Sequence, residues 1–138
     1  MSDDDLMREL IEAFRSEVGE LFDGLASLIA ELPSAQGPRL SETIRAAMRL
    51  AHNLKGASGS VGLNELSQVA HAFESVLALL QHRAALPNPE QIRVLEAAVI
   101  AMQSLAEQTR VSDASTVSRL IERLESVAQE SDAAVSMH

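Results

Sequence analysis

The 138-residue chain contains no cysteine, no tryptophan and no tyrosine. Without cysteine it can form neither disulfides nor zinc–thiolate sites, and it has no thiol nucleophile. Aromatic residues make up 2% of the sequence, too few for base-stacking platforms or aromatic ligand cages. Basic residues are also scarce. The 11 Lys and Arg against 20 Asp and Glu give a net charge of −9, which argues against nucleic acid and anionic membranes as partners.

Long apolar runs are missing as well. No stretch approaches the roughly 18 uninterrupted apolar residues of a membrane-spanning helix, and the N-terminus is acidic where a signal peptide would be basic. We therefore expect a cytoplasmic protein with no direct membrane contact. The chain does contain 46% hydrophobic and 22% charged residues, which is a globular profile. Its length fits one domain with its own core.

Hydrophobic residues recur every three or four positions along nearly the whole chain, which indicates helices. Pro33 ends the first stripe, Ser41 is a candidate cap for the second helix, and Asn88 followed by proline is a typical helix start. Short loops favour antiparallel neighbours. We expect an all-α domain in residues 1–130, an antiparallel four-helix bundle with a fifth C-terminal helix, monomeric when isolated. The predicted helices span about residues 4–32, 41–57, 63–83, 89–109 and 115–130, with a linker or disordered end at 131–138.

A polar stripe on the second predicted helix carries the first candidate site. Arg45, Arg49 and His52 follow at helical spacing and point away from the apolar face. Lys55, the only lysine in the chain, lies on the same face, and Gly56 follows it. A neutral imidazole is a nucleophile near neutral pH, and an ammonium group offers compact positive charge to phosphoryl oxygens. A solvated surface histidine is the alternative, but this combination favours a histidine that accepts and donates a phosphoryl group.

The third predicted helix carries a second polar group. His71 and Glu74 are three residues apart, and Gln68 lies one turn before His71, all on the face opposite the apolar stripe. If this helix packs antiparallel to the second, a carboxylate could accept the Nδ1–H of His52 and leave Nε2 free to attack. A solvated pair formed by His71 and Glu74 alone is the alternative that the spacing leaves open.

The segment Arg49-Leu-Ala-His-Asn-Leu-Lys-Gly-Ala-Ser-Gly-Ser-Val-Gly-Leu63 resembles the phosphoacceptor segment of histidine phosphotransfer (HPt) domains. It is most similar to the N-terminal domain of CheA-type chemotaxis histidine kinases. The segment from His71 to Leu77 resembles the third helix of those domains, and the likeness covers about residues 4–130. Ser58-Gly59-Ser60 departs mildly from the small or apolar residues of the family.

The resemblance implies a role for individual positions. His52 is expected to be the phosphorylated residue, Lys55 to steady the phosphoryl oxygens, Glu74 to hydrogen-bond the ring, and His71 to lie near the phosphoryl group. The remaining histidines, His82 and His138, match nothing in the pattern and are expected on the surface. The expected partner-docking residues are Arg45, Arg49, Gly56, Gly59 and Gln68.

The expected function is that of a phosphoryl carrier. A histidine kinase ATP-binding domain, in cis or in trans, would phosphorylate His52, and the group would pass to an aspartate of a response-regulator receiver domain. We expect no cofactor or metal in this chain, with ATP and Mg²⁺ on the partner domains, because the chain has no glycine-rich phosphate loop. We expect this chain to be the N-terminal piece of a CheA-type kinase. Whether the chain alone counts as an enzyme therefore stays open.

Two other functions remain as alternatives. The first is a non-catalytic helical interaction module, either a degenerate carrier or an adaptor. The second is a metal-binding helical bundle, but dinuclear carboxylate bundles use Glu-x-x-His pairs, and this sequence contains none. The intact set of His52, Lys55 and Gly56 favours the carrier over both.

Overall fold

The computed structural model describes residues 2–83, 86–107 and 114–136. All regular structure in these residues is helical, which confirms the predicted all-α class. None of the described helices is long and apolar enough to cross a lipid bilayer. The elements in chain order are α1 (Asp3–Glu31), the 3-10 turn η1 (Leu32–Ser34), α2 (Pro38–Ser60), α3 (Asn64–Arg83), α4 (Pro89–Glu107) and α5 (Ala114–Ser136).

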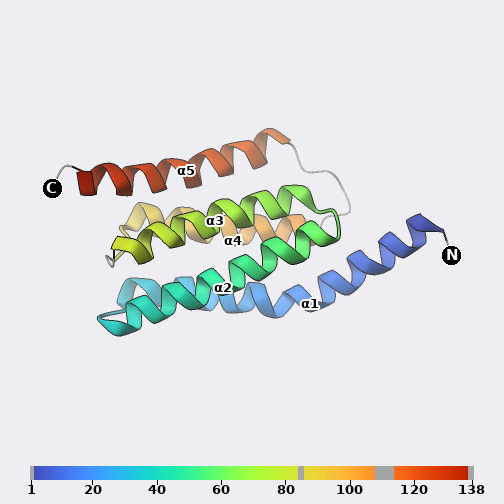
Figure 1. The fold of residues 1–138 in the computed structure, drawn as a ribbon, viewed down its shortest axis with the longest axis horizontal. Helices are drawn as coiled ribbons and strands as arrows, with labels where there is room; N and C mark the ends of the chain where they lie inside the picture. Colours follow the sequence, from blue (N-terminus) through green and yellow to red (C-terminus); the bar gives the residue numbers. More distant parts are fainter. Residues whose placement is uncertain (1, 84–85, 108–113, 137–138) are drawn as a thin grey trace.

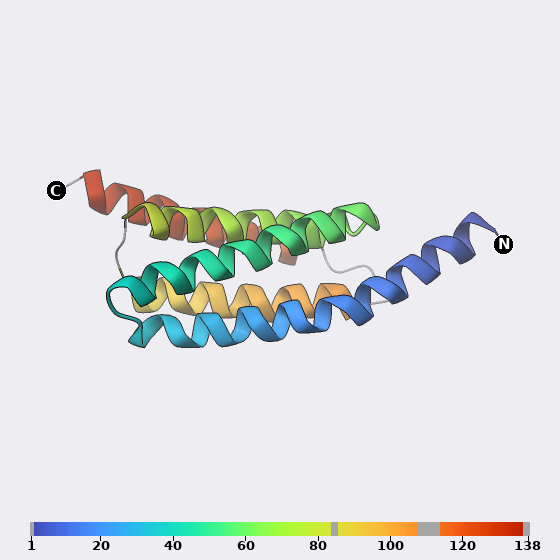
Figure 2. The same cartoon turned by 60° about the horizontal axis from the view of Figure 1, so that its bottom comes forward.

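The first four helices form an antiparallel bundle (Figure 1). Each of them contacts the next along the chain, and α4 closes the ring against α1. Helix α5 packs outside this ring against α3 and α4, and the first turns of α1 project beyond the other helices (Figure 2). Because α5 covers α3 and α4, it leaves the outer surface of the α2–α3 pair open to solvent, and this pair carries the candidate site.

The core is one cluster of hydrophobic side chains to which all five α-helices contribute. Leu25, Leu54, Phe73, Met102 and Leu124 represent the five helices and are all fully buried. Truncation of such a residue to alanine typically costs about 2–5 kcal/mol. The residues that directly follow Leu54 and Phe73 are candidate site residues, so the packing of the core fixes the main chain from which they project.

Helix α2 begins earlier than the sequence predicts. Gly37, with φ of 58°, is the N-cap residue and Pro38 occupies the first turn, where a missing N–H costs nothing. The expected cap, Ser41, therefore lies inside the helix. Its Oγ accepts a hydrogen bond of 2.9 Å from Gln81 Nε2 and so links α2 to α3.

Helix α2 also ends later than predicted. Gly56, Gly59 and Gly62 are clustered near its end, and only the last of them breaks the helix. Gly62 has a φ of 81°, which favours glycine. The Gly62 N–H donates to the Gly59 carbonyl at 3.1 Å, and the Leu63 N–H donates to the Ser58 carbonyl at 2.9 Å. These two bonds form a Schellman ending, so Gly56 and Gly59 lie within the last turns of α2.

Helix α4 begins where the sequence predicts, whereas α5 ends later than predicted. Asn88 Oδ1 accepts from the Gln91 N–H at 2.8 Å, and Gln91 Oε1 accepts from the Asn88 N–H at 2.9 Å, a reciprocal capping arrangement. Helix α5 continues to Ser136, past the predicted end at residue 130 and into the segment predicted to be a linker. That segment contains neither glycine nor proline, so no residue type in it stops a helix. The predicted end of α4 at residue 109 lies outside the described residues.

Candidate functional site

His52 projects from the outer face of α2, between turns whose inner residues are buried. Its side chain is 65% exposed, whereas Ala51 and Leu54 beside it are fully buried. The ring Nδ1 lies 3.1 Å from Glu74 Oε2 on α3. Because a carboxylate can only accept hydrogen bonds, this contact places the proton on Nδ1. The neutral ring then carries its lone pair on Nε2, the nitrogen that the contact leaves free.

Glu74 joins two candidate residues of α2 at once. While Oε2 meets the His52 ring, Oε1 accepts a hydrogen bond of 3.1 Å from Lys55 Nζ. The Glu74 side chain is only 20% exposed and the Lys55 side chain 29% exposed, so water screens this pair less than an ion pair on the open surface. The alternative of a separate His71–Glu74 pair is therefore not what the structure shows, because Glu74 reaches across to α2.

Two further cations lie beside His52. Arg45 and Arg49 are exposed, and within the described part of the chain neither forms an ion pair. They border an open hollow of about 320 Å³ next to the imidazole, whose full lining is Arg45, Met48, Arg49, His52, Asn53 and Glu74. The region around the imidazole thus presents positive charge on a chain that is strongly acidic as a whole.

The two glycines predicted to serve docking differ in their surroundings. A Cβ built on Gly56 would meet no heavy atom of a described residue within 4 Å beyond its own helix backbone and chain neighbours. The packing of the bundle therefore does not require glycine at this position. A Cβ on Gly59 would lie 3.5 Å from Ser67 Oγ, so Gly59 borders the seam between α2 and α3, although the residue is itself exposed.

Three serine hydroxyls donate to main-chain carbonyls of the turn that follows His52, and the sequence analysis gave them no role. Ser58 Oγ donates to the Leu54 carbonyl at 2.7 Å, and Ser60 Oγ donates to the Gly56 carbonyl at 3.0 Å. Ser67, from α3, donates to the Lys55 carbonyl at 3.1 Å. The departure of Ser58-Gly59-Ser60 from the family pattern was the one signal in the sequence. Ser67 had no signal of its own.

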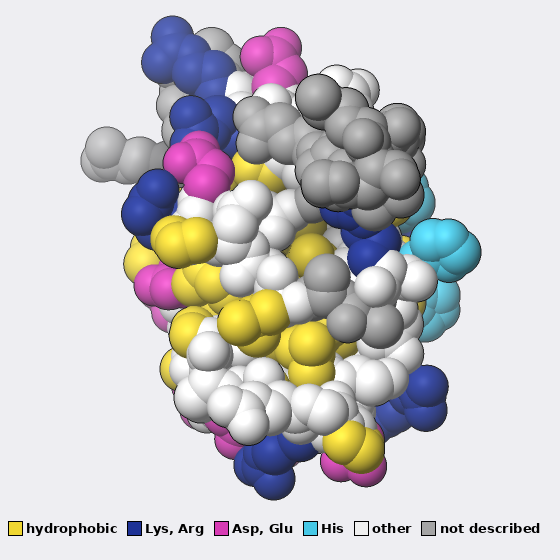
Figure 3. Space-filling view, turned by 90° about the vertical axis from the view of Figure 1, so that its left-hand side faces the viewer, with side chains coloured by type: hydrophobic (Ala, Val, Ile, Leu, Met, Phe, Trp, Pro, Cys, Tyr) yellow, Lys and Arg dark blue, Asp and Glu magenta, His cyan; other side chains and the backbone are white. Residues whose placement is uncertain are grey.

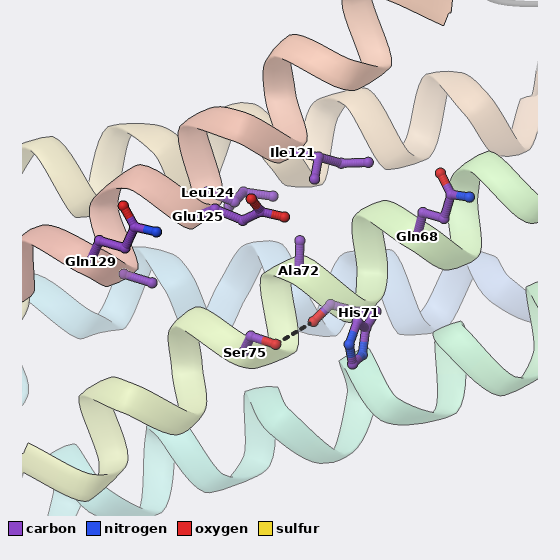
Figure 4. Close-up of a pocket in the computed structure, with 9 residues that line it drawn as sticks. Gln68, His71, Ala72, Ser75, Ile121, Leu124, Glu125 and Gln129 are labelled. Carbon is purple, nitrogen blue, oxygen red and sulfur yellow. Dashed lines mark hydrogen bonds between the residues drawn. The ribbon is translucent and has the colours of Figure 1, made fainter. Parts of the chain in front are cut away.

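His71 and Gln68 border a different hollow, between α3 and α5. It measures about 520 Å³, and Ile121 and Leu124 of α5 supply apolar lining. Figure 4 shows that the His71 ring points toward α2 and away from α5, and that the Ser75 hydroxyl bonds to the His71 carbonyl. Gln68 lines this second hollow and is not among the residues that line the hollow beside His52. The structure therefore brings His52, Lys55 and Glu74 into contact and places Gln68 on an adjoining face.

The histidine side chains gather along one edge of the molecule when the bundle is seen end-on, with Lys and Arg side chains nearby (Figure 3). His82, in the last turn of α3, is exposed as expected, and His138 lies outside the described residues. No group of three or more His, Asp or Glu within the described part of the chain could hold a metal ion. The metal-binding alternative thus gains no support from these residues.

Comparisons with known proteins identify a family, a similar sequence and a similar fold. The sequence profile described as Hpt domain matches residues 9–105. The chemotaxis protein CheA of Rhizobium meliloti (strain 1021) is 30% identical over 125 residues, which cover 88% of this chain but 16% of that protein. The phosphorylated P1 domain of CheA3 from R. sphaeroides, solved in complex with CheY6, superposes with a TM-score of 0.76 at 17% identity, over 88% of this chain and 97% of that one.

The profile match contains the exposed histidine of α2, the lysine one turn later and the α3 glutamate that contacts both. It spans more than half of the chain, and the solved P1 domain has the same helical fold. The chain therefore belongs to the Hpt domain family.

Proposed function

We propose that this domain is a phosphoryl carrier in a two-component phosphorelay, with His52 as the residue that is phosphorylated. The observation that carries the proposal is the state of the imidazole: Nδ1 lies 3.1 Å from Glu74 Oε2 while the ring is 65% exposed. In the first step, the Nε2 lone pair attacks the γ-phosphorus of ATP held by a kinase domain. A P–N bond forms as the P–O bond to ADP breaks, and ADP leaves.

The Nδ1 proton stays in place through both transfers. Attack by Nε2 makes the ring cationic, and the Glu74 carboxylate stabilises that charge through a charge-assisted hydrogen bond. In the second step, an aspartate oxygen of the receiver attacks phosphorus, the P–N bond breaks, and its electrons return to Nε2. The ring is again neutral with its proton on Nδ1, so neither transfer needs a proton acceptor or donor from the chain.

Lys55 and the two arginines supply positive charge for the transferred group and for the partner. Glu74 holds the Lys55 ammonium beside the imidazole, where it can neutralise phosphoryl oxygens. Arg45 and Arg49 form no ion pair with any described residue and lie next to an open hollow, which suits an acidic partner surface. The absence of a side chain at Gly56 leaves room for that surface to approach, and His71, whose ring faces α2, is assigned a place near the phosphoryl group.

The partners follow from this chemistry and from the similar proteins. One of them, the P1 domain of CheA3, was solved with CheY6 bound, which supports a response-regulator receiver as the acceptor. The other is named a chemotaxis protein CheA, which supports a CheA-type kinase domain as the donor, in cis or in trans. ATP and Mg²⁺ are assigned to these partner domains, and ATP as the phosphoryl source places the reaction in the cytoplasm.

The deciding experiment is labelling with radioactive γ-phosphate of ATP by a CheA-type kinase core. Wild-type protein should gain an acid-labile, alkali-stable label and lose it when a receiver domain is added. His52→Gln should gain no label, while the control His82→Gln, which changes another exposed histidine, should behave as wild type. Label retained on His52→Gln would refute the assignment. A folded wild-type domain that no kinase core labels would favour the interaction module instead.

A further inference from the structure

We infer that Ser67 is a positioning residue for this site, which acts through the main chain of α2; the inference rests on the proposed role of His52. The Ser67 hydroxyl on α3 donates to the main-chain carbonyl of Lys55 on α2 at 3.1 Å. The hydroxyls of Ser58 and Ser60 bond within their own helix, and Ser58 reaches both the Leu54 carbonyl at 2.7 Å and the same Lys55 carbonyl at 3.1 Å. The Ser67 bond instead joins the two helices at the residue whose ammonium group contacts Glu74.

Gly59 lies opposite Ser67 at the point where the two helices meet. A Cβ at Gly59 would stand 3.5 Å from Ser67 Oγ, which is ordinary van der Waals contact. A small side chain at this position therefore fits beside the serine without displacing its hydroxyl from the Lys55 carbonyl. The small residue on α2 and the hydroxyl on α3 therefore form a matched pair at the seam between the helices.

This pair lies in the same register as the reacting pair. His52 precedes Gly59 by seven residues on α2, and Glu74 follows Ser67 by seven residues on α3. Seven residues are about two helical turns and about 10.5 Å along the axis, and they fall only about 20° short of two full turns. Because the helices are antiparallel, Gly59 faces Ser67 at one level and His52 faces Glu74 two turns away. As long as Gly59 stays opposite Ser67, the helices cannot slide along each other and separate His52 from Glu74.

The bond matters for the chemistry because the hydrogen bonds of Glu74 are sensitive to small displacements. Both contacts of its carboxylate are 3.1 Å long, near the upper end of the usual range for N–H···O hydrogen bonds. A shift of a few tenths of an ångström in the Lys55 turn would weaken them. The expected consequence of losing the Ser67 hydroxyl is a ring whose proton is no longer confined to Nδ1.

The test compares Ser67→Ala with two other variants. Ser67→Thr keeps a hydroxyl at the same position. Ser75→Ala is the matched control, because the Ser75 hydroxyl donates at 3.1 Å to a carbonyl of its own helix, that of His71. Nitrogen-15 NMR of the imidazoles reports the Nδ1–H population of His52. Labelling by phosphoramidate, a small donor that needs no kinase docking, reports the reactivity of Nε2, and urea unfolding confirms that each variant is folded.

Ser67→Ala should lower the Nδ1–H population of His52 and slow labelling about fivefold, equivalent to about 1 kcal/mol. Ser67→Thr and Ser75→Ala should both stay near the wild-type values. Wild-type values in Ser67→Ala, or an equal loss in Ser75→Ala or in Ser67→Thr, would overturn the inference. If the wild-type protein takes up no label from any donor, the carrier function fails, and the NMR comparison still decides whether Ser67 positions the ring.

Discussion

Replacement of Glu74 by glutamine is the sharpest test of how the site works, because it keeps the size of the side chain and removes its charge. In the wild-type protein, the carboxylate accepts from His52 Nδ1 and from Lys55 Nζ, each at 3.1 Å. A glutamine has one carbonyl oxygen for these two donors, and its NH₂ group is itself a donor. At least one of the two contacts must therefore be lost in Glu74→Gln.

The size of the effect follows from the change in charge. A hydrogen bond to a charged group contributes about 1.5–3 kcal/mol, and a neutral one about 1 kcal/mol. The imidazole is 65% exposed, which places its contribution toward the lower end of that range. The loss of charge stabilisation as the ring becomes cationic should therefore be about 0.5 kcal/mol if a neutral hydrogen bond replaces the charged one, and about 1.5 kcal/mol if none does. Phosphorylation should slow about two- to twelvefold. Glu74→Ala removes both acceptors and should be at least as slow.

The assay is the initial rate of labelling, first with phosphoramidate and then with a kinase core. Phosphoramidate isolates the chemistry of the ring from the docking of a partner, so the two donors should show the same fold-change if Glu74 acts on the ring. Urea unfolding should show a folded protein for each variant. A wild-type rate with both donors in folded Glu74→Gln would remove Glu74 from the mechanism. A loss seen with the kinase core alone would make it a docking residue.

The remaining predictions concern one residue each. Lys55→Ala should slow transfer from phosphorylated protein to a receiver at least threefold and lower the free energy of unfolding by less than about 1 kcal/mol; an unchanged transfer rate contradicts the role of the ammonium. Gly56→Leu should slow receiver transfer more than tenfold, while urea unfolding shows unchanged or slightly higher stability, because glycine costs about 0.5–1 kcal/mol inside a helix; a loss of stability would show a structural role instead. Asn88→Ala should lower the free energy of unfolding by about 1 kcal/mol through loss of the α4 cap and leave labelling unchanged; unaltered stability in urea would contradict the capping role.

The helices and their order could be predicted because their signals are local. The stripe from Leu6 to Leu32 and the Asn88–Pro89 start each depend on a few neighbouring residues, and the structure confirms the helices that they predict. The limits of α2 were harder to predict because more than one residue could form each end. Ser41 and Gly37 could both cap the start, and any of three glycines could end it. Only Gly37 and Gly62 have the positive φ that glycine allows, and a backbone angle leaves no separate mark in a sequence.

The candidate site also has one part that local spacing predicts and another that depends on how the helices pack. The face shared by His52 and Lys55 follows from the helical period alone, so spacing on α2 predicts it. The contact of Glu74 with both residues depends on how far α3 slides along α2, so spacing alone predicts it only on the condition that the two helices pack antiparallel. Sliding is set by many apolar contacts together, among them those of Leu54 and Phe73 in the core. No single residue type therefore predicts the register of α3 against α2.

A signal for the register does exist, but it lies in a pair of spacings rather than in a motif. In two antiparallel neighbours, contacts at two levels require equal separations on both helices. His52 and Gly59 are as far apart on α2 as Ser67 and Glu74 are on α3. The contact of Gly59 with Ser67 and the hydrogen bond of His52 with Glu74 can therefore form together. The pattern consists of two pairs across the helices, a small residue opposite a hydroxyl and a nucleophile opposite a carboxylate, separated by seven residues on each helix. It can be sought in other chains before their structures are known. Where the two separations differ by one residue, the helix turns by about 100° between the levels, and the carboxylate cannot face the ring while the small-residue contact holds.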